Sequence, residues 1–120
     1  MGAFVISKRL NDKYKFEYTS RKGKTVFTSS SFELKFECEA EIEYLKTNLG
    51  SAVFLKSKTS KGKYFFRLIV ENKEIALSRK YSTQLMLEKG IDEILKYSYK
   101  SETLDFSGPN FIFEETSFAQ

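Results

Sequence analysis

The chain has 120 residues, of which 41% are hydrophobic and 16% aromatic, and its formal net charge is +4 at pH 7. This length suits one small domain with a single core, and the hydrophobic share is far above that of disordered chains. There is no histidine and only one cysteine, Cys38. These counts exclude an intrachain disulfide, a Ser-His-Asp triad, a Cys-His dyad and a metal centre built on cysteine and histidine.

No stretch of the sequence reaches the roughly 18 consecutive apolar residues that a helix needs to cross a bilayer. Residues 1–10 also lack the apolar core and cleavage site of a secretory signal. We therefore expect a cytoplasmic protein without a membrane partner.

The sequence aligns with itself at an offset of fifty residues. Six identical pairs share this offset, beginning with Phe4 and Phe54 and ending with Phe16 and Phe66. The offset becomes 49 after Ser30, and apolar positions continue to match beyond it. Such internal similarity predicts a duplicated unit. We expect two units, at about residues 3–49 and 53–98, inside one compact domain that spans residues 1–100.

Each unit begins with three predicted strands. Residues 13–18 alternate between charged and aromatic side chains, which is the pattern of a half-buried antiparallel strand. Residues 63–70 repeat this alternation, but Phe65 and Ile69 occupy the outer face beside Lys63 and Arg67. Turn residues precede and follow both strands, so each unit should contain a three-stranded meander.

An amphipathic helix should follow the strands in each unit. The apolar side of the first helix consists of Leu34, Cys38, Ile42, Leu45 and Leu49. The apolar side of the second consists of Leu87, Ile91 and Ile94, with Ser82 or Thr83 as the N-cap. Because Cys38 lies on this apolar side, we interpret it as a core residue and not as a reactive thiol.

Both units resemble the short repeat of the YegP-like family of bacterial and archaeal proteins, whose function is not established. The resemblance covers about residues 3–98. It rests on the aromatic strands at residues 13–16 and 63–66, the turns at residues 22–23 and 72–73, and Phe32 or Tyr81 ahead of a helix with Ile42 or Ile91. The second unit keeps the family's Gly-Ile pair as Gly90 and Ile91, whereas the first has Glu41 in place of the glycine. The resemblance implies an α+β fold of tandem repeats, often a homodimer, with no catalytic residues to carry over.

We therefore expect an α+β fold made of two tandem βββα repeats, in which two amphipathic helices pack on an antiparallel sheet. Residues 101–120 would follow as an acidic C-terminal tail or as an added strand. The strand would form at residues 111–113, where a short apolar run follows a Gly-Pro-Asn turn signal.

Basic residues are concentrated in the predicted strands: residues 1–30 carry a net charge of +5 and residues 51–80 carry +6. A basic strand face that also carries an aromatic ring, such as Lys63, Phe65 and Arg67, is typical of proteins that bind single-stranded nucleic acid. The simpler interpretation is that these lysines keep sheet edges from pairing. Phe65 and Ile69 instead suggest a self-association surface, unless the other unit covers them.

The candidate interaction residues are therefore Lys63, Phe65, Arg67 and Ile69. The leading hypothesis is a small non-enzymatic interaction protein that forms a homodimer and engages a macromolecular partner. That partner would be a protein or a nucleic acid. An enzyme that uses carboxylate, lysine or tyrosine chemistry is the less favoured alternative, because no spacing in the sequence selects a catalytic pair. We expect no cofactor and no metal.

Overall fold

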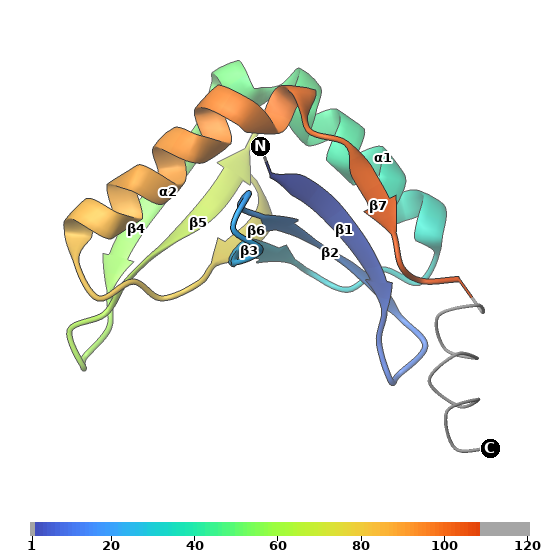
Figure 1. Ribbon diagram of the computed structural model, residues 1–120, viewed down its shortest axis with the longest axis horizontal. Helices are drawn as coiled ribbons and strands as arrows, with labels where there is room; N and C mark the ends of the chain where they lie inside the picture. Colours follow the sequence, from blue (N-terminus) through green and yellow to red (C-terminus); the bar gives the residue numbers. More distant parts are fainter. Residues whose placement is uncertain (1, 109–120) are drawn as a thin grey trace.

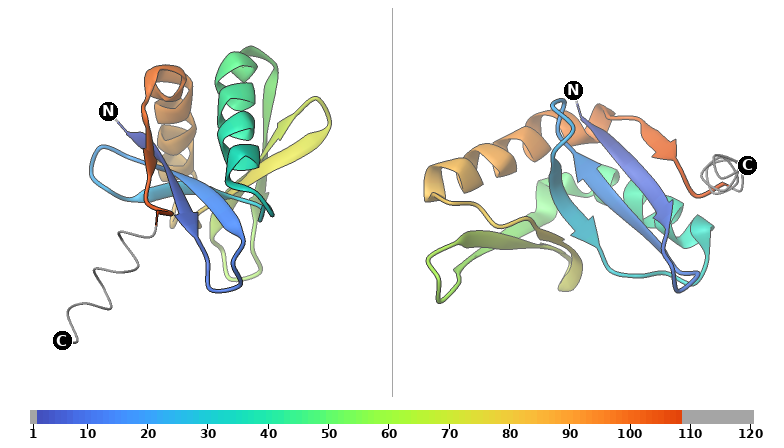
Figure 2. Two further views of the ribbon diagram at one scale, coloured as in Figure 1. Left: turned by 90° about the vertical axis from the view of Figure 1, so that its right-hand side faces the viewer. Right: turned by 60° about the horizontal axis from the view of Figure 1, so that its bottom comes forward.

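The computed structural model of the protein describes residues 2–108. Seven strands form one sheet, and two helices lie on the same side of it (Figures 1 and 2). The strands are β1 (Ala3–Lys8), β2 (Tyr14–Thr19), β3 (Thr25–Ser29), β4 (Ala52–Lys58), β5 (Tyr64–Val70), β6 (Lys73–Ser78) and β7 (Thr103–Asp105). The helices are α1 (Lys35–Thr47) and α2 (Gln84–Tyr97), followed by the short 3-10 helices η1 (Leu49–Ser51) and η2 (Ser98–Lys100), respectively.

The sheet is mixed, with the strand order β4-β5-β6-β3-β2-β1-β7. All neighbouring strands run antiparallel except β7, which runs parallel to β1 and pairs Leu104 with Val5. The two three-stranded meanders meet at β3 and β6, where Thr28 pairs with Leu77. One continuous sheet therefore connects the two halves of the chain.

The predicted architecture of two βββα repeats on a purely antiparallel sheet is wrong, although the α+β class is correct. The structure has a seventh strand outside the proposed units, and this strand makes the sheet mixed. Strand β7 has only three residues and one apolar side chain, so it carries no alternation from which a strand can be predicted. The strand predicted at residues 111–113 lies outside the described residues.

The turns between strands lie where the sequence predicted them. Several residues in these turns adopt left-handed backbone conformations. Gly23 and Gly62 have φ values of +81° and +85°. Glu71 and Asn72, which connect β5 to β6, both have positive φ. Positive φ at both central residues is the requirement of a type I′ hairpin turn, which matches the twist of the flanking strands.

The hydrophobic core lies between the sheet and the helices. Inward-facing strand residues such as Phe4, Phe16 and Phe66 are completely buried there. The predicted apolar sides of both helices face this core, with one exception: Leu34 is 52% exposed, because it is the N-cap residue of α1 and precedes the helix. The N-cap of α2 is Thr83, whose hydroxyl oxygen accepts a hydrogen bond from the Met86 amide at 3.2 Å.

Each helix covers strands of its own half, and α1 also contacts a hairpin of the other half. Helix α1 lies over β1 and β2, and α2 lies over β5. The β5–β6 hairpin reaches α1, where the Tyr44 hydroxyl donates to Glu71 and the Lys73 ammonium lies 3.1 Å from Glu41. Within residues 2–108, no helix is long and apolar enough to cross a membrane.

Candidate functional site

The face of the sheet opposite the helices, called the open face below, is not covered by any helix in the described part of the chain (Figure 1). The strand register places one group of large apolar residues on this face. They form the apolar patch, which consists of Val53, Leu55, Phe65, Ile69 and Leu77. Val53, Leu55 and Leu77 are 55%, 48% and 45% exposed. Contiguous exposed apolar groups of this kind usually mark a contact surface.

The structure places three of the four predicted interaction residues on the open face. Phe65, Arg67 and Ile69 alternate along β5, and each is partly buried by its cross-strand neighbours. Lys63 is exposed and precedes β5 in the β4–β5 loop, which its amide helps to close by donating to the Thr59 hydroxyl at 3.0 Å.

Arg67 is already engaged by two neighbours within the protein. Its guanidinium lies over the Phe65 ring, 5.4 Å from the ring centroid, and its Nε lies 3.4 Å from the Glu74 carboxylate. The cation is therefore partly neutralised in the middle of the apolar patch. A phosphate group would have to compete with Glu74 for this guanidinium.

The same face of the other half is mainly polar. Its corresponding row pairs Val5 with Glu17 and Glu17 with Thr28, whereas the row in the second half pairs Leu55 with Arg67 and Arg67 with Leu77. The two three-stranded meanders therefore have similar strand pairing but different side chains on the open face. The fold itself does not require an apolar open face, so the apolar patch is a property of the second half.

The two edges of the sheet also differ. Strand β7 covers the outer edge of β1, where the Phe4 amide donates to the Glu102 carbonyl at 2.9 Å. No strand within residues 2–108 pairs with the outer edge of β4. Strand β4 is seven residues long and contains no proline. An edge of this kind presents unpaired backbone donors and acceptors to any approaching strand.

Sequence reasoning did not identify Val53, Leu55 and Leu77 as members of the site. Residues 52–55 are all apolar, so their alternation is invisible. The signal that identifies Val53 and Leu55 is the internal alignment: because Phe54 matches Phe4 as an inward residue, its two neighbours must point outward.

The reactive side chains of the core are shielded from solvent. Cys38 is fully buried, and its pKa is raised to about 11, first by burial and then by the neighbouring glutamates. Burial also raises the pKa of Tyr81, an effect that Arg79 opposes. No group of three or more Cys, Asp or Glu side chains in the described segment is arranged to hold a metal ion.

Comparison with known proteins places the chain among uncharacterised bacterial proteins, although no family model matches it. The UPF0339 protein YegP of Escherichia coli O6:H1 is 30% identical over 105 residues, which cover 86% of this chain and 94% of YegP. The K12 strain's YegP is also 30% identical, over 78% of this chain and 86% of its own.

Two solution NMR structures have the same fold. That of YegP from E. coli, described as a protein of unknown function, matches with a TM-score of 0.75 and 26% identity and covers 91% of this chain and 96% of its own. A UPF0339 protein from Shewanella oneidensis matches with a TM-score of 0.79 and 24% identity over 88% of this chain and 92% of its own. From its 30% identity over most of both chains, the protein belongs to the UPF0339 family, the family of YegP.

Proposed function

We propose that the protein is a non-enzymatic interaction module that forms a homodimer through β4 and the adjoining apolar patch. The observation that supports this proposal is the exposure of Val53, Leu55 and Leu77 on a face that ends at β4, whose outer edge pairs with no strand within residues 2–108. Pairing of edge strands satisfies backbone hydrogen bonds, and the patch adds apolar contacts beside them. The cytoplasmic location stays a prediction.

The charges on β4 restrict the register of the proposed dimer. A symmetric antiparallel pair centred on Leu55 would place Lys56 opposite Phe54 of the second copy and Lys58 opposite its Ala52. A pair centred on Lys56 would place two like charges directly opposite each other, which destabilises a sheet. We propose the register centred on Leu55, because it avoids this repulsion and brings the two Leu55 side chains together in a two-fold interface where both copies use the same surface.

The proposed dimer doubles the apolar patch. Two sheets joined in this register would present their open faces on the same side, with the Leu55 side chains adjacent at the centre. We propose that this wider surface engages a protein partner. An apolar centre suits a protein better than a nucleic acid, and the Arg67 guanidinium is paired with Glu74.

The test introduces a positive charge on β4 and, as a matched control, on β1. Leu55→Lys should convert the dimer into a monomer, because it places a charge at the two-fold axis. Val5→Lys makes the same change at the corresponding open-face position of β1, whose edge β7 covers, and should leave the dimer intact. Size-exclusion chromatography with light scattering measures both, and circular dichroism confirms that both variants fold.

Two results would overturn the proposal. One is a monomeric wild-type protein at high micromolar concentration. The other is an equal loss of dimer in Leu55→Lys and Val5→Lys, which would move the interface away from β4.

Nucleic-acid binding is the second candidate function, supported by Lys63 and Arg67 beside the Phe65 ring. It predicts that a labelled single-stranded oligonucleotide binds with an affinity that falls steeply with salt. It also predicts that changing both cations to glutamate abolishes the binding. Fluorescence anisotropy with wild-type protein and this double variant decides between the two partners.

A further inference from the structure

The two outer edges of the sheet are equivalent in sequence but differ in what covers them. Strand β7 runs parallel to β1 and covers its outer edge, with Leu104 opposite Val5. Strand β4 corresponds to β1, because Phe54 matches Phe4 at the offset of fifty, yet no strand within residues 2–108 covers its outer edge. The first half therefore shows what kind of segment fits the edge of the second half.

Strand β7 presents different chemistry to the two sides of the sheet. Leu104 lies opposite Val5, an open-face residue. Asp105 points to the helix side, where its carboxylate lies 2.9 Å from the Lys35 ammonium of α1. The edge of β1 thus accepts a short parallel strand in which an apolar residue is followed by an acidic one.

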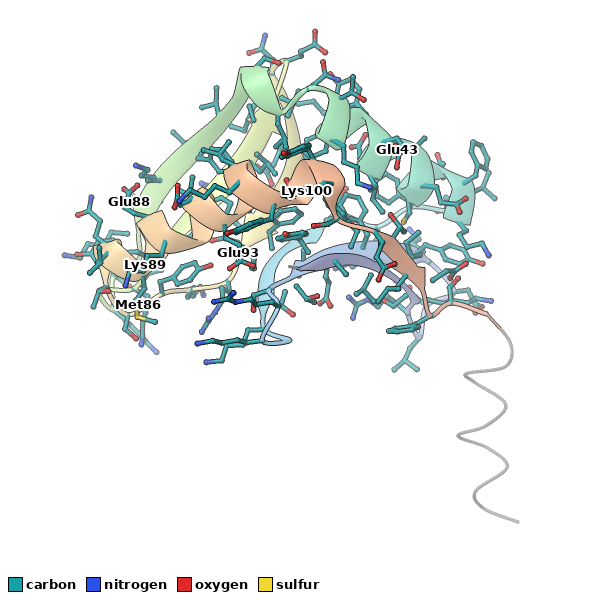
Figure 3. All side chains as sticks on the ribbon, turned by 45° about the horizontal axis from the view of Figure 1, so that its top comes forward. Glu43, Met86, Glu88, Lys89, Glu93 and Lys100 are labelled. Atoms are coloured by element: carbon teal, nitrogen blue, oxygen red, sulfur yellow. The ribbon has the colours of Figure 1, made fainter. Side chains whose placement is uncertain are left out.

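Strand β4 offers the same two environments at its outer edge. Val53 and Leu55 are exposed on the open face. On the helix side, the Lys56 ammonium lies 2.6 Å from the Glu88 carboxylate, and Figure 3 shows Glu88 on the side of α2 next to β4. Strand β4 itself contains two lysines and no acidic residue. A complementary strand would be apolar towards the open face and acidic towards the helices.

The C-terminal sequence contains such a segment, since residues 111–114 are Phe-Ile-Phe-Glu. A parallel register like that of β7 on β1 would place residues 111–113 opposite residues 53–55, all of them apolar. The same register would place Glu114 opposite Lys56. One register therefore combines apolar cross-strand pairs with a pair of opposite charges, and both kinds of pair stabilise a sheet.

The length of the chain determines which copy can supply this segment. Residue 113 is five residues beyond Gly108, and five residues span at most about 18 Å. The strand order puts β4 six strand spacings from β7, which is about 29 Å across the sheet. Figure 1 shows these two strands on opposite sides of the molecule. The segment cannot reach β4 of its own chain, but it can reach β4 of a second copy.

We propose that residues 111–114 of a second copy add to β4 as a short parallel strand. In this position Phe113 would cover Leu55 of the apolar patch, and Glu114 would pair with Lys56. The inference rests on the proposed function, because it uses the same strand edge. It names a competitor for the homodimer: β4 of a second copy and the C-terminal segment need the same backbone groups.

Paramagnetic broadening in a mixed sample tests the proposal. One copy is isotope-labelled wild-type protein, and the other is an unlabelled full chain with a nitroxide at Ser117→Cys, just beyond the pairing segment. The nitroxide attaches only there, because Cys38 is fully buried. The amide signals of β4 should lose intensity, whereas those of β1 should not, because β7 covers that edge. A β4–β4 pair alone would leave the nitroxides at the far edges of the sheet.

A charge exchange tests the register. Lys56→Glu in the isotope-labelled copy would place two like charges opposite each other and should reduce the broadening of β4. Glu114→Lys in the nitroxide copy should restore it when the two variants are mixed. Lys61→Glu makes the same change in the exposed β4–β5 loop and should leave the broadening unchanged. Broadening that persists in Lys56→Glu would overturn the proposed strand.

Light scattering on Phe113→Ser separates this inference from the homodimer. The β4–β4 interface does not use Phe113, so this variant should lose the broadening and keep the dimer. A wild-type dimer without any broadening of β4, or with broadening at β7 instead, would overturn the C-terminal strand and leave the homodimer standing. A monomeric Phe113→Ser variant would support the C-terminal strand and overturn the β4–β4 interface.

Discussion

Gly90 and Tyr81 restrict each other, because the tyrosine hydroxyl occupies the space that any side chain at position 90 would need. The matching pair in the first half, Glu41 and Phe32, shows the complementary solution. Without a hydroxyl on the aromatic ring, the helix carries a full side chain, and Glu41 is buried against Lys73. The two halves therefore differ here for a steric reason: the aromatic residue with a hydroxyl is combined with glycine, and the one without a hydroxyl is combined with a larger side chain.

This coupling predicts the effect of Gly90→Ala. Overpacking against Tyr81 should cost about 1–3 kcal/mol, and better helix propensity should return up to about 1 kcal/mol, so we expect a net loss of about 1–2 kcal/mol. In a Tyr81→Phe background, the atom at 2.5 Å is absent, and the same substitution should be nearly neutral. Urea unfolding of the four proteins gives the double-mutant cycle. An equal loss in both backgrounds would show that Tyr81 is not the cause.

Strand β7 depends on a carboxylate as well as on backbone pairing. Asp105 accepts hydrogen bonds from the hydroxyl and the amide of Ser107, and its carboxylate lies 2.9 Å from the Lys35 ammonium of α1. The hydroxyl of Ser107 lowers the pKa of Asp105 most, and Lys35 contributes further. These contacts connect the last strand to a helix as well as to β1.

The lowered pKa of Asp105 sets the pH range in which β7 is weakened. A carboxyl whose pKa is lower in the folded state stabilises that state above its unfolded pKa, about 3.9, and this stability is lost as pH falls through the folded pKa. Below pH 4, the Phe4 and Phe106 amides, which bond across the β1–β7 pair, should exchange with solvent faster relative to amides of β5. In Asp105→Asn, this relative change should disappear. If it persists, other carboxylates control the strand.

The elements differ in how far the sequence determines them. Strand β2 alternates charged with aromatic residues, β5 has a buried apolar residue at every second position, and each helix has one apolar side, so both kinds of element were predictable. Strand β7 was not, because its three residues form a strand only when the edge of β1 is available. The pocket between the β2–β3 hairpin and α2 was also not predictable. Its walls come from three segments whose proximity depends on the pairing of β3 with β6.

The two halves of the molecule are held together by contacts that neither half has alone. Strands β3 and β6 pair at the centre of the sheet, and the β5–β6 hairpin bonds to α1. The Tyr18 hydroxyl in the first half also lies 3.2 Å from that of Ser101, which follows α2. A half on its own would expose a central strand edge and part of the aromatic core. A unit of about 50 residues buries too little apolar surface to tolerate this loss.

We therefore predict that neither residues 1–50 nor residues 51–108 fold in isolation. The far-ultraviolet circular dichroism of each fragment should resemble that of an unfolded chain, whereas the full chain should unfold in urea through one transition followed identically by circular dichroism and tyrosine fluorescence. Mixing the two fragments should restore structure if β3–β6 pairing supplies the missing contacts. A fragment that folds alone, or two separate transitions in the full chain, would mean that the shared sheet does not couple the halves.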